Sequence, residues 1–143
     1  RKATRTVSSI LKTLRSQRPL VPIRLPSLRT ATTAALTPEE QALLRAAALD
    51  AMALLGKPRR AVLVHLDCGQ TLTLGDAAGN CAFCDVRVAG SVEAGACDRF
   101  AQQLSEAVAR IARTAPGGVY LSIAPLTQCY TDGCARPAHP PAP

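Results

Sequence analysis

The stretch TPEEQALLRAAALDAMALLGKPRRAVLVHL, from Thr37 to Leu66, contains a helix signal followed by a strand signal. Thr37 is a helix N-cap candidate, Pro38 suits the first helical position, and Glu40 completes a capping box. The glycine and proline of the GKP tripeptide end the helix. The apolar run AVLVHL that follows is typical of a buried strand. This stretch therefore predicts the α-β part of a β-α-β unit.

The flanking segments extend this plan into two similar units. Residues 26–33 form the expected first strand, and residues 82–88 alternate apolar with polar side chains, which indicates another strand. A helix is expected over residues 93–113, broken by Pro116-Gly117-Gly118 and followed by a strand over residues 119–123. Its apolar face comprises Cys97, Phe100, Leu104, Val108 and Ile111. We therefore expect an α/β (α+β) fold with both helices on one face of a four-stranded sheet, and an oligomer that covers the other face.

Five short motifs from Pro26 to Leu126 resemble, in ungapped order, the macrophage migration inhibitory factor (MIF) family of trimeric tautomerases. They are GKP with AVLVHL (residues 56–66), LTLGD (72–76), CAFC (81–84), AG (89–90) and PGGVYL (116–121). The resemblance covers about 100 of the 143 residues. It implies the MIF-like β-α-β repeat and a ring of three subunits, either a homotrimer or a heterotrimer of MIF-like chains.

The resemblance also implies a catalytic site. Pro26 matches the family's catalytic base, Lys57 matches the cation that binds the substrate carboxylate, and Tyr120 matches a hydroxyl contributed by an adjacent subunit. The sequence departs from the family pattern at Ala89, where the family has isoleucine, and at Ser122, where it has asparagine. The family's C-terminal tryptophan and phenylalanine have no counterparts here.

Pro26 is preceded by 25 residues, whereas the family's proline is the first residue of the mature protein. The nitrogen of an internal proline belongs to a planar amide, so it cannot accept a proton near neutral pH. A keto–enol tautomerase needs such an acceptor. The set Pro26, Lys57 and Tyr120 is therefore vestigial unless the chain is cut after Leu25. The sequence therefore favours a protein that is not an enzyme. The alternative is an isomerase of the phenylpyruvate tautomerase type.

Charge divides the chain. Residues 1–35 carry eight cations and no acid, whereas residues 36–129 carry eight basic and nine acidic side chains. We expect a basic N-terminal extension over residues 1–25, a MIF-like domain over residues 26–126, and a proline-rich tail over residues 127–143 that is extended towards its end.

The basic extension has three interpretations: a removed mitochondrial transit peptide, a disordered tail, or an arm that is ordered by a partner. The third is favoured, and its partner would be RNA phosphates or an acidic protein surface. The residues expected to bind a polyanion are Arg1, Lys2, Arg5, Lys12, Arg15, Arg18, Arg24 and Arg29. The composition favours an organellar, mitochondrial location over a cytoplasmic one and gives no indication of secretion.

The six cysteines do not indicate a disulfide scaffold, because the chain is long and apolar enough to form a core. Cys81 and Cys84 form a C-x-x-C, but on one strand their side chains would point to opposite faces about 10 Å apart. Cys129 and Cys134 in the tail could pair. We expect no cofactor, no metal site and no transmembrane segment.

Two functional hypotheses follow. The first is a non-catalytic structural subunit of a large organellar assembly, possibly a mitochondrial ribosome, whose basic arm contacts RNA or an acidic partner. The second is a phenylpyruvate/dopachrome-type tautomerase that is activated by cleavage before Pro26. A cytokine-like binding protein is a third reading, which rests on family analogy alone.

Overall fold

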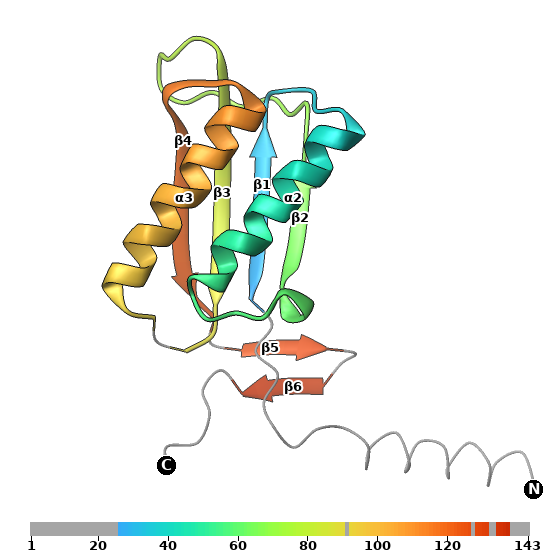
Figure 1. The fold of residues 1–143 in the computed structure, drawn as a ribbon, viewed down its shortest axis with the longest axis vertical. Helices are drawn as coiled ribbons and strands as arrows, with labels where there is room; N and C mark the ends of the chain where they lie inside the picture. Colours follow the sequence, from blue (N-terminus) through green and yellow to red (C-terminus); the bar gives the residue numbers. More distant parts are fainter. Residues whose placement is uncertain (1–25, 91, 127, 132–133, 138–143) are drawn as a thin grey trace, which may run out of the picture.

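The computed structural model describes residues 26–90, 92–126, 128–131 and 134–137. Two helices, α2 (Pro38–Ala53) and α3 (Ala94–Ala112), lie side by side on one face of a four-stranded sheet (Figure 1). The strands are β1 (Ser27–Thr32), β2 (Leu63–Asp67), β3 (Asn80–Val88) and β4 (Thr114–Pro125), with a short 3-10 helix, η1 (Arg59–Ala61), before β2. The expected architecture is confirmed.

The sheet order is β2-β1-β3-β4. β1 is parallel to β2, β3 is parallel to β4, and the two central strands β1 and β3 are antiparallel. Each outer strand thus returns from a helix to lie beside the strand that begins its own unit. This arrangement is the pseudo-twofold β-α-β repeat that the sequence predicted.

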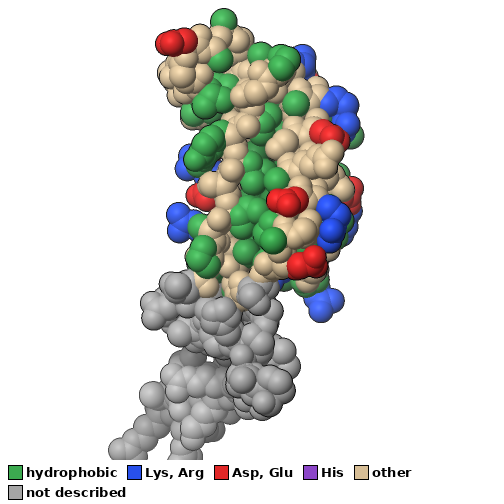
Figure 2. Space-filling view, turned by 90° about the vertical axis from the view of Figure 1, so that its left-hand side faces the viewer, with side chains coloured by type: hydrophobic (Ala, Val, Ile, Leu, Met, Phe, Trp, Pro, Cys, Tyr) green, Lys and Arg blue, Asp and Glu red, His purple; other side chains and the backbone are tan. Residues whose placement is uncertain are grey.

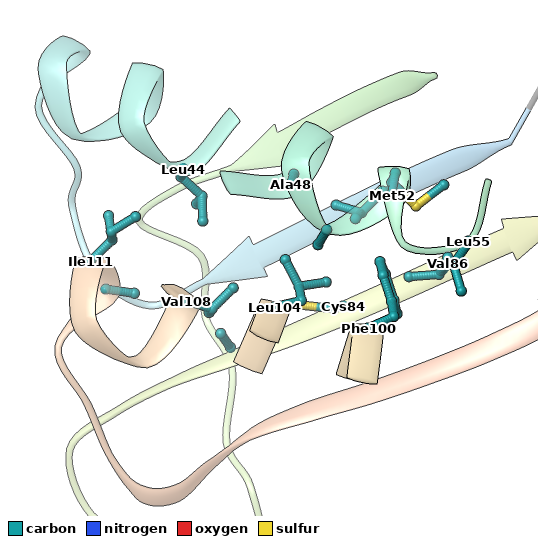
Figure 3. Close-up of a cluster of buried hydrophobic side chains, with 14 of the residues drawn as sticks. Leu44, Ala48, Met52, Leu55, Cys84, Val86, Phe100, Leu104, Val108 and Ile111 are labelled. Atoms are coloured by element: carbon teal, nitrogen blue, oxygen red, sulfur yellow. The ribbon is translucent and has the colours of Figure 1, made fainter. Parts of the chain in front are cut away.

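The core lies between the helices and the inner face of the sheet, and it is largely aliphatic (Figure 3). Leu28 and Val86, from the central strands, and Phe100 and Leu104, from α3, are fully buried. Two inward-facing threonines keep hydrogen bonds there: the Thr32 hydroxyl donates to the Cys81 carbonyl at 3.0 Å, and the Thr30 hydroxyl lies 3.5 Å from the Cys84 sulfur. Burial of these hydroxyls is tolerated because each has a partner.

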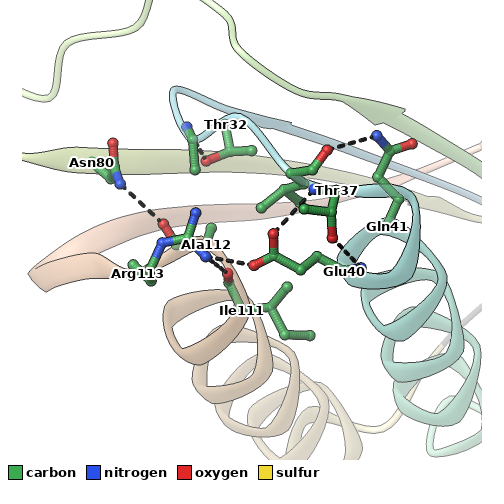
Figure 4. Close-up of polar contacts among 10 residues, drawn as sticks. Thr32, Thr37, Glu40, Gln41, Asn80, Ile111, Ala112 and Arg113 are labelled. Carbon is green, nitrogen blue, oxygen red and sulfur yellow. Dashed lines mark hydrogen bonds and ion pairs between the residues drawn. The ribbon is translucent and has the colours of Figure 1, made fainter.

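The start of α2 is the predicted capping box (Figure 4). The Thr37 hydroxyl accepts from the Glu40 N–H at 3.1 Å, and the Glu40 carboxylate accepts from the Thr37 N–H at 3.0 Å. The Arg113 guanidinium also donates to Glu40, which links the start of α2 to the end of α3. The hydrogen bond from the Thr37 backbone, followed by the one from Arg113, lowers the pKa of Glu40.

The predicted bounds of the second helix are close to those of α3, but the prediction that Pro116-Gly117-Gly118 lies between this helix and the last strand was wrong. α3 ends at Ala112, and the left-handed φ of 55° at its C-cap, Arg113, turns the chain, so β4 begins at Thr114 and contains the tripeptide. The β3–β4 register shifts between Asn80 and Ala82, and Gly117 has a φ of 74°. Glycine tolerates that conformation, so the strand continues through an irregularity.

The prediction that AVLVHL is a buried strand was also wrong. β2 is an outer strand whose alternate side chains face away from the helices, and Leu63 is 65% exposed. His65 on the same face pairs with Asp67, with 3.0 Å between Nε2 and Oδ1. The helices cover only one face, so alternate residues of an outer strand stay open whatever their hydrophobicity.

Beyond β4, β5 (Gln128–Thr131) and β6 (Cys134–Pro137) pair antiparallel as a two-stranded sheet. The sequence indicated an extended tail but not this pairing. No helix in the described part of the chain is long and apolar enough to span a membrane.

Candidate functional site

Pro26 lies directly before β1, at the end of the sheet where β3 finishes. Its side chain is less than 2% exposed, and its carbonyl accepts a hydrogen bond from the Leu63 N–H at 3.0 Å. The β1–β3 register pairs Ser27 with Arg87, so Pro26 lies opposite the last residue of β3. The strand pairing thus fixes the position of Pro26 on both sides.

Lys57 is brought to the same end of the sheet by the turn after α2. Gly56, with a φ of 72°, reverses the chain, and the Lys57 N–H donates to the Met52 carbonyl at 3.2 Å. The side chain is only 7% exposed, and its Nζ donates to the Ala89 carbonyl at 3.2 Å. The predicted pair Pro26 and Lys57 therefore converges on the residues that follow β3.

The Ala89 carbonyl is a functional group that the sequence reasoning missed. Ala89 was noted as a departure from the family turn, but its backbone oxygen is what holds the Lys57 ammonium. Gly90 follows with a φ of 83°, which favours glycine and shapes this turn. Gly90 was the sequence signal for this turn. The sequence did not indicate which carbonyl the turn would orient towards Lys57.

Tyr120 does not join Pro26 and Lys57 within one chain. It is paired in register with Phe83, which is paired in turn with Ala31, five residues along β1 from Pro26. At a rise of about 3.3 Å per residue, this places Tyr120 roughly 16 Å further along the sheet. Tyr120 is 54% exposed, and its ring stacks on that of Phe83 with 5.8 Å between the ring centroids. A role beside Pro26 would require the Tyr120 of another subunit, as the resemblance implies.

Seven of the eight predicted polyanion-binding residues, Arg1 to Arg24, lie outside the described residues. The eighth, Arg29, is on the open face of the sheet, where its Nε lies 2.9 Å from Asp67 Oδ2. The hydrogen bond from Arg29 holds the pKa of Asp67 below its usual range. Arg29 is thus part of a local ion pair on the sheet, and its role towards a polyanion stays a prediction.

The described cysteines Cys68, Cys81, Cys84 and Cys97 are free, as expected for the C-x-x-C pair. Burial raises the pKa of the Cys84 thiol, which disfavours the reactive thiolate. Among the described residues, no cluster of three or more histidine, cysteine or acidic side chains is arranged to hold a metal ion. The side chains of Cys129 and Cys134, which the sequence leaves open to pairing, lie outside the described set.

This end of the sheet combines a buried ammonium, a backbone carbonyl and a proline whose nitrogen is acylated by Leu25. An ammonium can neutralise a carboxylate, but an amide nitrogen cannot accept a proton near neutral pH. In the uncut chain, an anion could therefore bind Lys57 if it displaced the Ala89 carbonyl from the ammonium. Pro26 supplies no base there.

Comparison with known proteins places this geometry in context. The family model described as macrophage migration inhibitory factor (MIF) matches residues 25–131. The structure of Leishmania major MIF2 is similar, with 18% identity, a TM-score of 0.71, and coverage of 78% of this chain and 97% of that one. Toxoplasma gondii macrophage migration inhibitory factor has 25% identity and a TM-score of 0.64, with 70% and 89% covered.

A further similar structure is that of Pt0534 inactivated by 2-oxo-3-pentynoate, with 16% identity, a TM-score of 0.61, and 70% and 85% covered. No curated protein sequence matches the chain significantly. The structural similarities at this level of identity concern the fold.

Proposed function

The chain belongs to the macrophage migration inhibitory factor family, and from this premise we propose that the uncleaved protein is a non-catalytic subunit of a larger assembly. One observation carries the proposal: Pro26 is internal and buried, so its nitrogen is an amide in a closed environment. Without a basic nitrogen, the proton transfer of a keto–enol tautomerase has no acceptor at this position.

The state of Lys57 supports the same proposal. Lys57 is only 7% exposed, and its ammonium already donates to the Ala89 carbonyl. A substrate carboxylate would have to compete with that carbonyl and enter a site that Pro26 helps to fill. In the uncut chain, Lys57 thus connects the turn after α2 to the residue that follows β3.

The basic extension supports a polyanionic partner for this subunit. Its cations are not offset by any acid within residues 1–35, whereas the domain is close to neutral. Such a segment binds phosphates through charge neutralisation and counterion release. We propose that the assembly is an organellar ribonucleoprotein, with a mitochondrial ribosome as the specific candidate.

The polyanion proposal is tested by measuring binding of the full chain to single-stranded RNA between about 50 and 200 mM salt. If about five phosphates of the single strand are neutralised, the slope of log K against log salt concentration should be about −3.5. A chain that starts at Pro26 is the matched control, and it should bind far more weakly. A flat salt response of the full chain would contradict the electrostatic argument.

A second candidate is a tautomerase produced by cleavage between Leu25 and Pro26. The observation that favours it is the retention of Lys57 at the same end of the sheet as Pro26. Cleavage would turn the Pro26 amide into a secondary amine beside this cation. The similar structure of Pt0534, described as inactivated by 2-oxo-3-pentynoate, suggests that 2-oxo acids are suitable probes.

Three proteins separate the two candidates: the full chain, a chain beginning at Pro26, and a chain beginning with alanine in place of Pro26. Phenylpyruvate tautomerisation and covalent labelling by 2-oxo-3-pentynoate are measured for each. In labelling, the free amine adds across the triple bond, and its proton moves to the neighbouring carbon, which adds the full mass of the probe. We expect neither activity nor Pro26 labelling in the full chain.

Activity of the intact full chain would refute the proposed non-catalytic role. Activity of the Pro26-initiated chain alone, lost in the alanine variant, would identify a latent enzyme. The intact mass of the native protein then decides which form exists in the cell, because a chain that begins Pro-Ser-Leu-Arg would establish the second candidate.

A further inference from the structure

The outward side of α2 is apolar, although it faces away from the core. Only four of the 16 residues of this helix are charged, and Ala46 and Ala53 are exposed, as is Leu54 at the C-cap. The exposed positions of α3 from residue 98 onward are instead polar: Asp98, Arg99, Gln102, Gln103, Glu106 and Arg110. Charged side chains accordingly gather towards the right-hand edge of Figure 2, on the outward side of α3. A helix with an apolar outward side is normally covered by a further element, and no described element lies over α2 (Figure 1).

Two adjoining hollows lie along the junction between α2 and α3. One, of about 300 Å³, is lined on the α2 side by Leu54. The other, of about 200 Å³, is lined on that side by Ala47 and Asp50. Gln103 and Glu106 of α3 line both hollows. Together they form one groove with an α2 wall that is mainly apolar and an α3 wall that is polar, which we call the interhelical groove.

The N-terminal extension contains a segment whose sequence suits this groove. Its apolar residues fall at the i, i+3, i+4, i+7 spacing of one helix face: Val7, Ile10, Leu11 and Leu14. As a helix, residues 7–14 would be about 12 Å long, and the groove follows α2 for about 10 Å between Ala47 and Leu54. So short a helix is not stable alone in water, so it needs a surface on which to pack.

The extension joins the domain at the end of the fold where the groove begins. Leu54 is followed by the turn that brings Lys57 to the end of the sheet where Pro26 lies. Residues 15–25 connect the segment to Pro26, and 11 extended residues span up to about 36 Å. The whole of α2, with 16 residues, is only about 24 Å long. The segment can therefore reach the groove of its own chain.

We propose that residues 7–14 dock as a helix in the interhelical groove of the same chain. The apolar side of the segment packs against Ala46, Ala47 and Leu54, in the way that amphipathic helices bind apolar grooves. Lys12 and Arg15, on the other side of the segment, stay exposed and available to phosphates. The proposal goes beyond the proposed function, because docking is intramolecular and takes place without RNA.

Photo-crosslinking of the full chain without RNA identifies what occupies the groove. Gln103, which lines both hollows, is replaced by p-benzoylphenylalanine, and exposed Ala42, which lines neither, is replaced in the control. Irradiation should join position 103, but not position 42, to residues 7–14. A mixture of isotope-labelled and unlabelled chains should give cross-links within one copy only. Cross-links to a second copy, equal cross-linking from both positions, or none to the segment would overturn the proposal.

Trypsin measures how firmly the segment is docked, because cleavage after Lys12 and Arg15 requires the undocked form. If the segment is docked for about nine-tenths of the time, cleavage should be about tenfold slower than in a free peptide of residues 1–25. Ile10→Ser/Leu14→Ser removes two apolar contacts and keeps every cation of the extension, so this variant should be cleaved as fast as the peptide. The RNA measurement above does not depend on these apolar residues, so failure of docking is distinguishable from failure of the proposed function.

A pair of domain variants tests the groove itself. Gln103→Lys/Glu106→Lys adds three units of positive charge inside the groove and should restore fast cleavage, because the basic segment is repelled. Ala42→Lys/Asp98→Lys adds the same charge at exposed helix positions outside the groove and should be cleaved as slowly as the original chain. Circular dichroism checks that both variants keep their helices. Equal cleavage rates in the two variants would contradict docking in the groove.

Discussion

The two β-α-β units share a topology but are stabilised differently. α2 of the first unit begins with a complete capping box, and its buried positions include two alanines, Ala48 and Ala51. In α3 of the second unit, the N-cap residue Glu93 makes no side-chain cap hydrogen bond, and the helix buries Phe100, Leu104 and Val108. The first helix is thus specified mainly by local signals, and the second mainly by what its apolar face contacts.

The difference has a functional counterpart. The first unit supplies Pro26 and Lys57, and the second supplies the Ala89 carbonyl that receives Lys57. The long apolar strand β4 also belongs to the second unit. The buried contact between Lys57 and Ala89 therefore joins the two units at the end of the sheet where Pro26 lies.

The largest expected effect is at Phe100. Phe100→Ala removes the largest fully buried side chain and leaves a cavity, so the free energy of unfolding should fall by about 3–5 kcal/mol. Leu43→Ala, at an exposed position of α2, should change it by less than about 0.5 kcal/mol. Urea unfolding measures both, and a loss under about 1 kcal/mol for Phe100→Ala would contradict the view that burial specifies α3.

A smaller effect is expected at the cap of α2. Thr37→Ala leaves the Glu40 N–H without its side-chain acceptor, so the free energy of unfolding should fall by about 1 kcal/mol. Thr37→Ser keeps the acceptor and should retain most of the stability. Glu93→Ala is the comparison in α3, where no side-chain cap exists to be lost. Equal losses for Thr37→Ala and Glu93→Ala would remove the distinction between the two helices.

The smallest effect concerns the carboxylate that links the two helices. Folding lowers the pKa of Glu40, so its stabilising contribution is present above the unfolded-state pKa, near 4.5, and is lost as pH falls through the folded-state value. Glu40→Gln should therefore reduce stability at neutral pH and flatten the acid limb of the stability curve. Thermal unfolding between pH 2 and 7 measures both effects. If stability falls with decreasing pH as steeply in the variant as in the original protein, protonation of Glu40 does not contribute to acid unfolding.

The sequence named Pro26 and Lys57 as candidate site residues only through its resemblance to the MIF family, and the structure places both at the same end of the sheet. The contact between the Lys57 ammonium and the Ala89 carbonyl could not be predicted. It joins residues 32 positions apart, and it depends on the exact path of two turns. The β5–β6 pairing was missed for a different reason: each strand has only four residues, too few to show the alternation that marks a half-buried strand.

The sequence by itself determined the start of α2, the period-two pattern of β3 and the apolar stripe of α3, since each depends on neighbours within a few residues. It also determined that the nitrogen of Pro26 is an amide whenever Leu25 precedes it. Only the tertiary structure decided that β2 lies at an edge, that Pro116-Gly117-Gly118 lies inside β4, and that Pro26 and Lys57 lie at the same end of the sheet. These features arise from strand order and packing between distant segments, which no local pattern encodes.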